Sequence, residues 1–508
     1  MIAVATFFLH YLTAWRYGYF RDELYFIACG KHLAWGYVDQ PPLVAFVAWL
    51  AQPAHDTQLA LRVLPALAAA LAVAVTVELA RDLGGGRFAR ALAGTAVALL
   101  PAYLLLGNVL TTTSFEALSW SLVTWLVVRI VRARERDDGR ATPRLYVYAA
   151  AAIAFGLYAK YSMGLLVAAL LVGLLLTRER RALATPWAAA CAALTTLLVL
   201  PNFLWQAMHG WAFLAFMAGD AAHRHAFNNG LFLETHQLAS NALAFAAEQF
   251  TYTNPLSAPV WFCGIIAPFA WPKLRSLRFL SLAFGVVMLV AVVLEAKGYY
   301  VIGIYAPLLA VGAVVVERAA TWLRAIAFAA LVAVGVAAMP LSIPVLPLDG
   351  FIAYTKLLGM TGRDGTPARL VQPIYAEEFG WDRLAHDVAR YYDALPPAAR
   401  AATAIYADTY ADAGAIDFFG PAYGLPNAIG SQNTYWLWGT RGYDGSSLIA
   451  IGATRFTLLQ ASYASCRLLG TSNEPLKWVV EGPAPIYLCT HPKEPFARIW
   501  QRLRWYGS

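Results

Sequence analysis

Residues 17–43 read YGYFRDELYFIACGKHLAWGYVDQPPL, and this stretch decides how the rest of the chain is interpreted. It follows the first apolar segment, sets charged side chains among tyrosines and phenylalanines, and closes with Pro41-Pro42. A polar segment beside an apolar run needs a physical reason, because charges next to a bilayer are costly unless they are paired or solvated. The carboxylates Asp22 and Asp39 lie on either side of a predicted short helix and turn, so a folded-back loop would bring them together.

The composition indicates a polytopic α-helical membrane protein. Of the 508 residues, 60% are hydrophobic and 13% are charged, whereas soluble domains carry roughly 25% charged residues. Apolar runs of about 20 residues recur along the chain, and each can cross a hydrocarbon core of about 30 Å. We predict eleven transmembrane helices, near residues 1–16, 58–80, 88–106, 115–133, 145–158, 163–176, 186–205, 258–272, 279–295, 299–316 and 325–343.

Basic residues set the predicted orientation. One set of alternate loops holds about 17 Lys and Arg and the other holds about seven, and the richer set faces the cytoplasm in membrane proteins. The net charge of +8 therefore reflects topology rather than nucleic-acid binding. The outer loops 17–57 and 206–257 then lie outside, which in a bacterium is the periplasm. We predict two domains, a transmembrane domain over 1–345 and a soluble periplasmic domain over 350–508.

The C-terminal domain has ordinary soluble composition, with Gly, Pro, Asp and Asn turns between short mixed runs. Residues 455–463 and 485–491 alternate enough between apolar and polar side chains to suggest strands, which predicts a small α/β domain. Cys466 and Cys489 both belong to this domain and could pair in an oxidising compartment.

Asp22 and Glu23 are the first candidates for chemistry, and both have a structural alternative. Acidic residues near a helix start often only cap the helix and meet its dipole. Asp39 could likewise cap the helix that follows it. The aromatic surroundings, the adjacent Arg21 and the folded-back loop favour a functional reading. Two carboxylates held close together suit general-base catalysis or divalent-metal binding.

The loop also resembles a known family. An Asp-Glu pair after the first helix, and an acidic residue followed by x-Pro-Pro-Leu, match Asp22-Glu23 and Asp39. This pattern resembles the bacterial branch of the dolichyl-phosphate-mannose protein mannosyltransferase superfamily, which is similar to the lipid A aminoarabinose transferases. Further matches over residues 1–345 are Gly156–Ser162, Leu200–Asn202 with Trp205, Asn254–Leu256, Lys297–Tyr300 and Tyr305–Pro307.

The resemblance implies a GT-C fold and makes residues 1–345 the catalytic part of a membrane glycosyltransferase in the bacterial inner membrane. Such an enzyme takes a sugar from a polyprenyl-phosphate donor and transfers it, with inversion, to a lipid A, glycan or protein acceptor on the periplasmic side. Asp22 would be the base, and Asp39 and Glu23 belong to the same expected catalytic set.

Lysines at membrane depth fit this interpretation. Lys160 and Lys297 cost on the order of 2.5–3.5 kcal/mol each at mid-bilayer, so they either snorkel to the interface or line a cavity. In the second reading they hold the donor phosphate, and Arg21 assists with its planar fork. Tyr299 and Tyr300 would donate to the phosphate or line the sugar pocket; an aromatic belt at the interface is the alternative for both.

A divalent metal ion is the one cofactor that the resemblance implies. Some family members bind a metal with the acidic residue before Pro-Pro and a His from a later outer loop, which here would be Asp39 and His236. A solvated His on the amphipathic helix expected near 231–250 is the alternative. Relatives also carry an acidic residue in the turn that here reads NVLTTTSFE, and Glu116 comes slightly late in it, so a third carboxylate stays open.

A transporter or flippase of a lipid-linked sugar is the alternative function, because it would also explain many helices and buried lysines. It predicts carboxylates inside the helix bundle and inverted repeats with broken helices, neither of which is visible in the sequence. A non-catalytic scaffold leaves Asp22, Asp39 and Lys160 unexplained. The expected partners are a polyprenyl-phosphate sugar donor, the lipid bilayer and a glycan, lipid or protein acceptor, with no nucleic acid.

Overall fold

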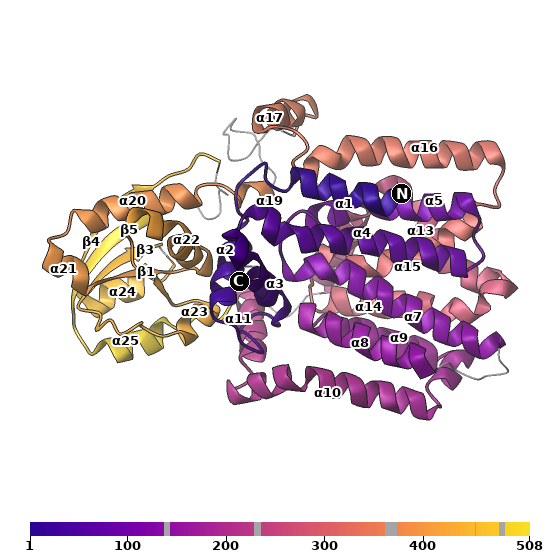
Figure 1. Ribbon diagram of the computed structural model, residues 1–508, viewed down its shortest axis with the longest axis horizontal. Coiled ribbons are helices and arrows are strands. Elements are labelled where there is room, and N and C mark those ends of the chain that lie inside the picture. Colours follow the sequence, from indigo (N-terminus) through magenta and orange to yellow (C-terminus); the bar gives the residue numbers. More distant parts are fainter. Residues whose placement is uncertain (137–142, 228–234, 361–372, 453, 477–482, 508) are drawn as a thin grey trace. The chain divides into compact units, whose positions relative to one another are not determined.

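The computed structural model describes residues 1–136, 143–227, 235–360, 373–452, 454–476 and 483–507. The chain divides into two compact units (Figure 1). The first unit comprises Met1–Ala14, Leu59–Leu204 and Leu231–Val345. The second unit comprises Trp15–Gln58, Trp205–Gly230 and Leu346–Ser508, so the polar stretch quoted above belongs to the same unit as the C-terminal part of the chain.

The first unit is helical (Figure 1). Its helices are α1 (Ile2–Thr13), α4 (Gln58–Asp82), α5 (Arg87–Ala98), α6 (Pro101–Leu106), α7 (Glu116–Arg136), α8 (Pro143–Ala159), α9 (Met163–Leu175), α10 (Pro186–Met208), α12 (Thr235–Tyr252), α13 (Ala258–Ala270), α14 (Arg278–Val293), α15 (Tyr305–Val316) and α16 (Thr321–Ala338). Every apolar segment predicted from the sequence overlaps at least one of them. Six helical segments in the described part are long and apolar enough to span a bilayer, and α1, α9 and α13 are shorter apolar helices. The structure is thus that of a multi-pass membrane protein, and the count of eleven crossings stays a prediction.

Two predicted helices are interrupted. The segment near 88–106 breaks at Leu99 and Leu100, because Pro101 disfavours helical backbone in the residue before it. The segment near 299–316 begins as a 3₁₀ helix, η6 (Gly298–Ile304), and continues as α15. This tight first part carries the tyrosines that the sequence singled out.

Close backbone contact joins α13 to α15. A Cβ atom on Gly312 would lie 1.8 Å from the carbonyl oxygen of Val260, and one on Gly264 would lie 2.1 Å from that of Leu308. Glycine is therefore required at both positions, in the manner of small residues that let membrane helices approach each other.

The second unit contains a five-stranded sheet with flanking helices (Figure 1). The strand order is β2-β1-β3-β5-β4, with β2, β1 and β3 parallel and β5 and β4 antiparallel. The strands are β1 (Thr403–Ala407), β2 (Ile429–Gly430), β3 (Ser447–Ile451), β4 (Tyr463–Ser472) and β5 (Ala484–Pro492). The helices are α2 (Arg21–Lys31), α3 (Leu43–Ala51), α11 (Ala212–Phe227), α17 (Leu348–Leu357), α19 (Pro373–Ala376), α20 (Trp381–Asp393), α21 (Pro397–Ala402), α22 (Tyr410–Phe419), α23 (Asn433–Leu437), α24 (Phe456–Ser462) and α25 (Phe496–Leu503). The predicted small α/β part is confirmed.

One face of the central strand β1 packs against two C-terminal helices. Ala404 and Tyr406 of β1 pack in one apolar cluster with Leu459 of α24 and Ile499 of α25. All five residues of β1 are buried, which is typical of a parallel strand covered on both faces.

Cys466 and Cys489, paired across β4 and β5, form a disulfide, as the sequence allowed.

One strand prediction is wrong and one is confirmed. Residues 485–491 lie within β5, as expected. Residues 455–463, expected as a strand, mostly form the helix α24 instead. Phe456 and Leu459 stand three residues apart, which puts them on one helix face: Phe456 stacks on Tyr487 at 3.8 Å between ring centroids, and Leu459 is buried.

Candidate active site

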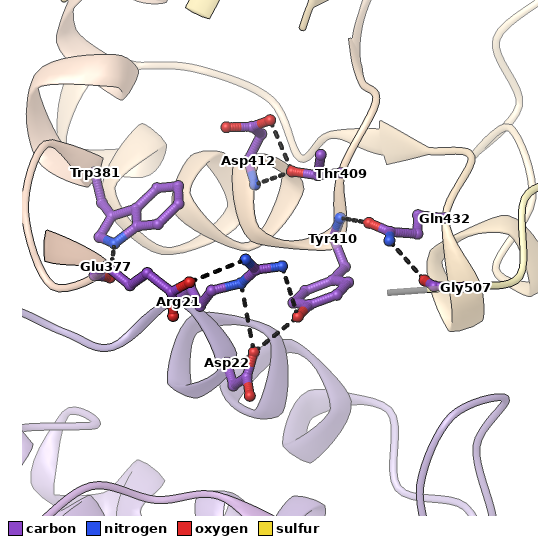
Figure 2. Close-up of polar contacts among 9 residues, drawn as sticks. All are labelled: Arg21, Asp22, Glu377, Trp381, Thr409, Tyr410, Asp412, Gln432 and Gly507. Carbon is purple, nitrogen blue, oxygen red and sulfur yellow. Dashed lines mark hydrogen bonds and ion pairs between the residues drawn. The ribbon is translucent and has the colours of Figure 1, made fainter. Parts of the chain in front are cut away.

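Asp22 lies in the first turn of α2 and is held by two groups (Figure 2). Its Oδ1 accepts a hydrogen bond from the Tyr410 hydroxyl at 2.8 Å and lies 3.7 Å from Arg21 Nε. Arg21 Nη2 donates to the same hydroxyl at 2.9 Å. A guanidinium and a phenol therefore fix one carboxylate oxygen, while the side chain as a whole stays 29% exposed and within reach of a substrate.

Arg21 is held on its other side by Glu377, whose Oε1 lies 3.4 Å from Nη1. Trp381 Nε1 donates to the Glu377 carbonyl oxygen at 2.9 Å and anchors this segment (Figure 2). The guanidinium also lies over the Tyr410 ring, 5.1 Å from its centroid. Because two carboxylates already balance its charge, Arg21 orders Asp22 in this structure, and its predicted role in phosphate binding stays a prediction.

Asp39 belongs to the same site. Its Oδ1 accepts a hydrogen bond from the Tyr25 hydroxyl at 2.7 Å, and that hydroxyl lies 2.7 Å from Thr434 Oγ1. Burial raises the pKa of Asp39 to about 7, although the Tyr25 hydrogen bond opposes the shift, and the nearby charge of Asp22 raises the pKa further. The two carboxylates singled out from the sequence therefore lie near enough to influence each other.

Glu23 is placed differently from its neighbour Asp22. It is fully buried, and its Oε2 accepts a hydrogen bond from the Phe20 N–H at 2.9 Å. This is the helix-capping arrangement weighed as the structural alternative. A catalytic role for Glu23 stays a prediction without support from this geometry.

In the first unit, Lys160 lies in a polar cluster at the end of α8. Its Nζ donates to Thr113 Oγ1 at 2.9 Å and to Glu116 Oε2 at 3.3 Å. Ser162 donates a short hydrogen bond to the other Glu116 oxygen. The Glu116 side chain is 1% exposed and the Lys160 side chain 16% exposed. Glu116, left open by the sequence, is thus the counter-ion of the predicted phosphate-binding lysine.

The predicted tyrosines surround the same ammonium group. Lys160 Nζ lies 3.9 Å from the ring centroid of Tyr300 and 5.8 Å from that of Tyr299. Both tyrosines come from η6, and their rings meet edge to face at 4.8 Å. Lys297, at the N-terminal cap of η6, is exposed. Three of the residues predicted to bind phosphate therefore meet in one cluster.

The metal prediction is not resolved. The side chain of His236 lies outside the described part of the structure, so its distance from Asp39 is not defined. Among the described residues no group of three His, Cys, Asp or Glu side chains could hold a metal ion. The metal ion stays a prediction.

Sequence reasoning missed Tyr410, Glu377 and Thr434. Tyr410 is 388 residues from its partner Asp22, and Thr434 is 409 residues from Tyr25. None of the three belongs to a motif, and nothing in the local sequence links them to the first loop. Tyr410 begins a helix shortly after the buried strand β1, and this position was the one available signal, because ligands gather at the carboxyl ends of parallel strands.

Comparisons with known proteins agree with this architecture. Residues 39–205 match the family described as dolichyl-phosphate-mannose-protein mannosyltransferase. A comparison with curated proteins finds no significant match. Two solved structures resemble the whole chain: ArnT from Cupriavidus metallidurans in the apo state (14% identity, TM-score 0.57) and the same protein bound to undecaprenyl phosphate (15% identity, TM-score 0.58). Each comparison covers 96% of this chain and 97% of ArnT. The chain therefore has a GT-C fold similar to that of ArnT, as the sequence predicted.

Proposed function

We propose that this protein is a membrane glycosyltransferase that moves a sugar from a polyprenyl-phosphate donor to an acceptor on the periplasmic side of the bacterial inner membrane. The ArnT fold supports the class of enzyme, since ArnT is a lipid A aminoarabinose transferase and one of its structures holds undecaprenyl phosphate. The family match over residues 39–205 agrees with it. The acceptor is a lipid, glycan or protein.

The paired carboxylates are the observation that carries this proposal. Asp22 is partly exposed and fixed by Arg21 and Tyr410, whereas Asp39 has a pKa raised to about 7 by burial. Two neighbouring carboxyl groups in different environments can take different roles. Asp22 would act as the base, and Asp39, with its pKa raised to about 7, would orient the acceptor by donating a hydrogen bond when it is protonated.

The proposed reaction is a single inverting displacement. The acceptor hydroxyl oxygen attacks the anomeric carbon and forms the new carbon–oxygen bond. The hydroxyl proton passes to Asp22. The bond between the anomeric carbon and the phosphate oxygen breaks, and its electron pair leaves with the polyprenyl phosphate. The transition state has oxocarbenium character, as in other glycosyl transfers that pass through a charged sugar ring.

Phosphate binding falls to Lys160 and Lys297, with Tyr299 and Tyr300 as donors or pocket walls. A cation beside the departing phosphate stabilises the charge that develops on it. Lys160 is held by Glu116 at 3.3 Å, so an arriving phosphate would compete with that carboxylate. Lys297 is exposed and makes no such ion pair in the described part of the chain.

The periplasmic placement of the second unit is supported by two independent observations. The Lys and Arg bias of the loops places the 17–57 segment outside the cytoplasm. The disulfide between Cys466 and Cys489 fits an oxidising compartment such as the periplasm.

A transfer assay with Asp22→Asn tests the proposal. Purified protein in detergent or membranes receives a panel of labelled polyprenyl-phosphate sugars with lipid and glycan acceptors. We expect the wild type to consume one donor and Asp22→Asn to bind it with kcat lowered about 10²- to 10⁴-fold, the range for loss of a general base. Asp382→Asn is the matched control, since Asp382 accepts a hydrogen bond from Tyr423 at 2.9 Å and is exposed.

Equal turnover by the wild type and Asp22→Asn would show that Asp22 only caps α2. The buried pair Glu116–Lys160 is the kind of feature that the transporter alternative predicts. Movement of lipid-linked sugar across vesicles by a wild type that transfers none would therefore replace the enzyme proposal with that alternative.

A further inference from the structure

We propose that Tyr410 is a positioning residue for Asp22, so that the C-terminal α/β part of the chain completes the active site. This inference rests on the proposed function, because Tyr410 would position Asp22, the residue proposed there as the base.

The Tyr410 hydroxyl organises the carboxylate. It donates to Asp22 Oδ1 at 2.8 Å and accepts from Arg21 Nη2 at 2.9 Å (Figure 2). The contact of Asp22 with Arg21 Nε, at 3.7 Å, also goes to Oδ1. Within the described part of the second unit, these contacts leave Oδ2 to accept the proton of an incoming hydroxyl.

Tyr410 is itself fixed from several directions. Its side chain is 8% exposed, and its ring packs against Tyr25 at 4.8 Å between centroids. Its backbone N–H donates to Gln432 Oε1 at 2.8 Å, and Gln432 Nε2 donates to the Gly507 carbonyl oxygen at 2.8 Å (Figure 2). A hydroxyl on such a rigid support can hold a catalytic carboxylate within the narrow range of geometry that catalysis needs.

The fold explains why Tyr410 reaches Asp22. Tyr410 begins α22, directly after β1, and the chain then forms β2 on one side of β1 and β3 on the other. Ligand sites lie at the carboxyl ends of parallel strands where the strand order reverses in this way. Here α2 occupies that place: a Cβ atom on Gly414 of α22 would lie 2.8 Å from the carbonyl carbon of Leu24, so glycine allows the two helices to touch.

Asp39 shows the same arrangement a second time. Thr434 Oγ1, from α23, lies 2.7 Å from the Tyr25 hydroxyl that donates to Asp39. The same Oγ1 accepts a hydrogen bond from the Val38 N–H at 3.1 Å. Asp22 and Asp39 are therefore each held, directly or through Tyr25, by a hydroxyl that follows a parallel strand of the C-terminal sheet.

Tyr410→Phe tests the inference, because it keeps the ring and removes the hydroxyl. Tyr423→Phe is the matched control: it also removes a tyrosine–aspartate hydrogen bond, 2.9 Å long, but at the exposed Asp382. With the donor that the wild type uses, we expect Tyr410→Phe to lower kcat about 10- to 100-fold, in line with loss of one charge-assisted hydrogen bond. The donor KM should stay within about twofold of wild type, and Tm should match that of Tyr423→Phe.

A second variant covers the case in which Tyr410→Phe is unstable. Thr434→Val removes the other hydroxyl with little change in shape, and we expect it to lower kcat about 10-fold without raising KM. A kcat within twofold of Tyr423→Phe for both variants would overturn the inference, as would losses of kcat and Tm that run in parallel. If the wild type transfers no sugar, the proposed function fails and this inference fails with it. If the wild type and both variants transfer sugar equally well, only this inference fails.

Discussion

Lys160→Met provides a test of the polar cluster in the first unit that does not depend on activity. The change leaves the Glu116 carboxylate, which is 1% exposed, without its cation at 3.3 Å. Removing one partner of a buried ion pair costs about 3–5 kcal/mol, because the remaining charge stays buried and uncompensated. Lys160 is 16% exposed and Ser162 still donates to Glu116, so we expect the lower end, about 3 kcal/mol of unfolding free energy.

The double variant Lys160→Met/Glu116→Gln makes the prediction sharp. It removes both charges, and loss of a whole buried pair is often close to neutral. We therefore expect it to recover about 2 kcal/mol of the loss, which is a typical interaction energy between contacting residues. Arg129→Met is the matched control: the Arg129–Asp82 pair, at 3.6 Å, is 46% and 33% exposed, so its loss should cost less than about 1 kcal/mol.

Denaturant unfolding of the purified variants in one detergent measures these differences. The reasoning is refuted if Lys160→Met is as stable as Arg129→Met, or if the double variant is no more stable than the single one. The double variant also allows polyprenyl-phosphate binding to be measured in a protein that lacks Lys160 but has regained most of its stability. A folded protein that lacks Lys160 should bind polyprenyl phosphate about 10- to 100-fold more weakly if this lysine holds the phosphate, which corresponds to one charge-assisted contact.

Two further predictions concern the second unit. The pKa of Asp39, raised by burial to about 7 from an ordinary 3.8, means that the folded protein keeps a proton that the unfolded chain releases. The contribution of Asp39 to stability should therefore fall as pH rises from about 4 to 7, by about 2 kcal/mol once partial exposure of Asp39 is allowed for. Asp408, whose pKa burial raises to about 6, acts in the same direction, so Asp39→Asn should reduce the difference between unfolding curves at pH 5 and 8 without abolishing it. An equal pH dependence of the variant and the wild type would contradict the prediction. Cys466 and Cys489 are 23 positions apart, so replacing both with Ala should lower stability by about 3 kcal/mol through loop-closure entropy. Limited proteolysis with and without reductant should show the same loss in the wild type, and unchanged proteolysis of the double-Ala variant would argue against a stabilising bond.

The helical part could be predicted because its signal is local. An apolar run of about 20 residues has one stable solution in a bilayer, so the predicted segments fall on helices, even where Pro101 or η6 interrupts them. The strand expected over 455–463 failed for the opposite reason. Phe456 and Leu459 are three positions apart, which puts them on one helix face and on opposite faces of a strand, and the segment packs against β5 as a helix.

The site could be predicted only in part. Asp22 and Asp39 carry a motif, so the sequence pointed to both, and the folded-back loop does bring them near each other. Tyr410 and Thr434 carry none, because their relation to the first loop arises from packing of α22 and α23 against α2 and the residues after it. A capping carboxylate and the proposed catalytic one also look alike in a sequence: Glu23 and Asp22 are adjacent, yet Glu23 is buried against backbone and Asp22 is partly exposed.

The contact between Asp22 and Tyr410 has a consequence for biogenesis. Their codons are 388 apart, and at about 5–20 residues per second the ribosome needs roughly 20–80 s to travel from one to the other. During that interval the nascent chain holds Asp22 without its hydroxyl partner. The proposed base therefore gains its positioning hydroxyl only after Tyr410 has been translated and α22 has packed against α2.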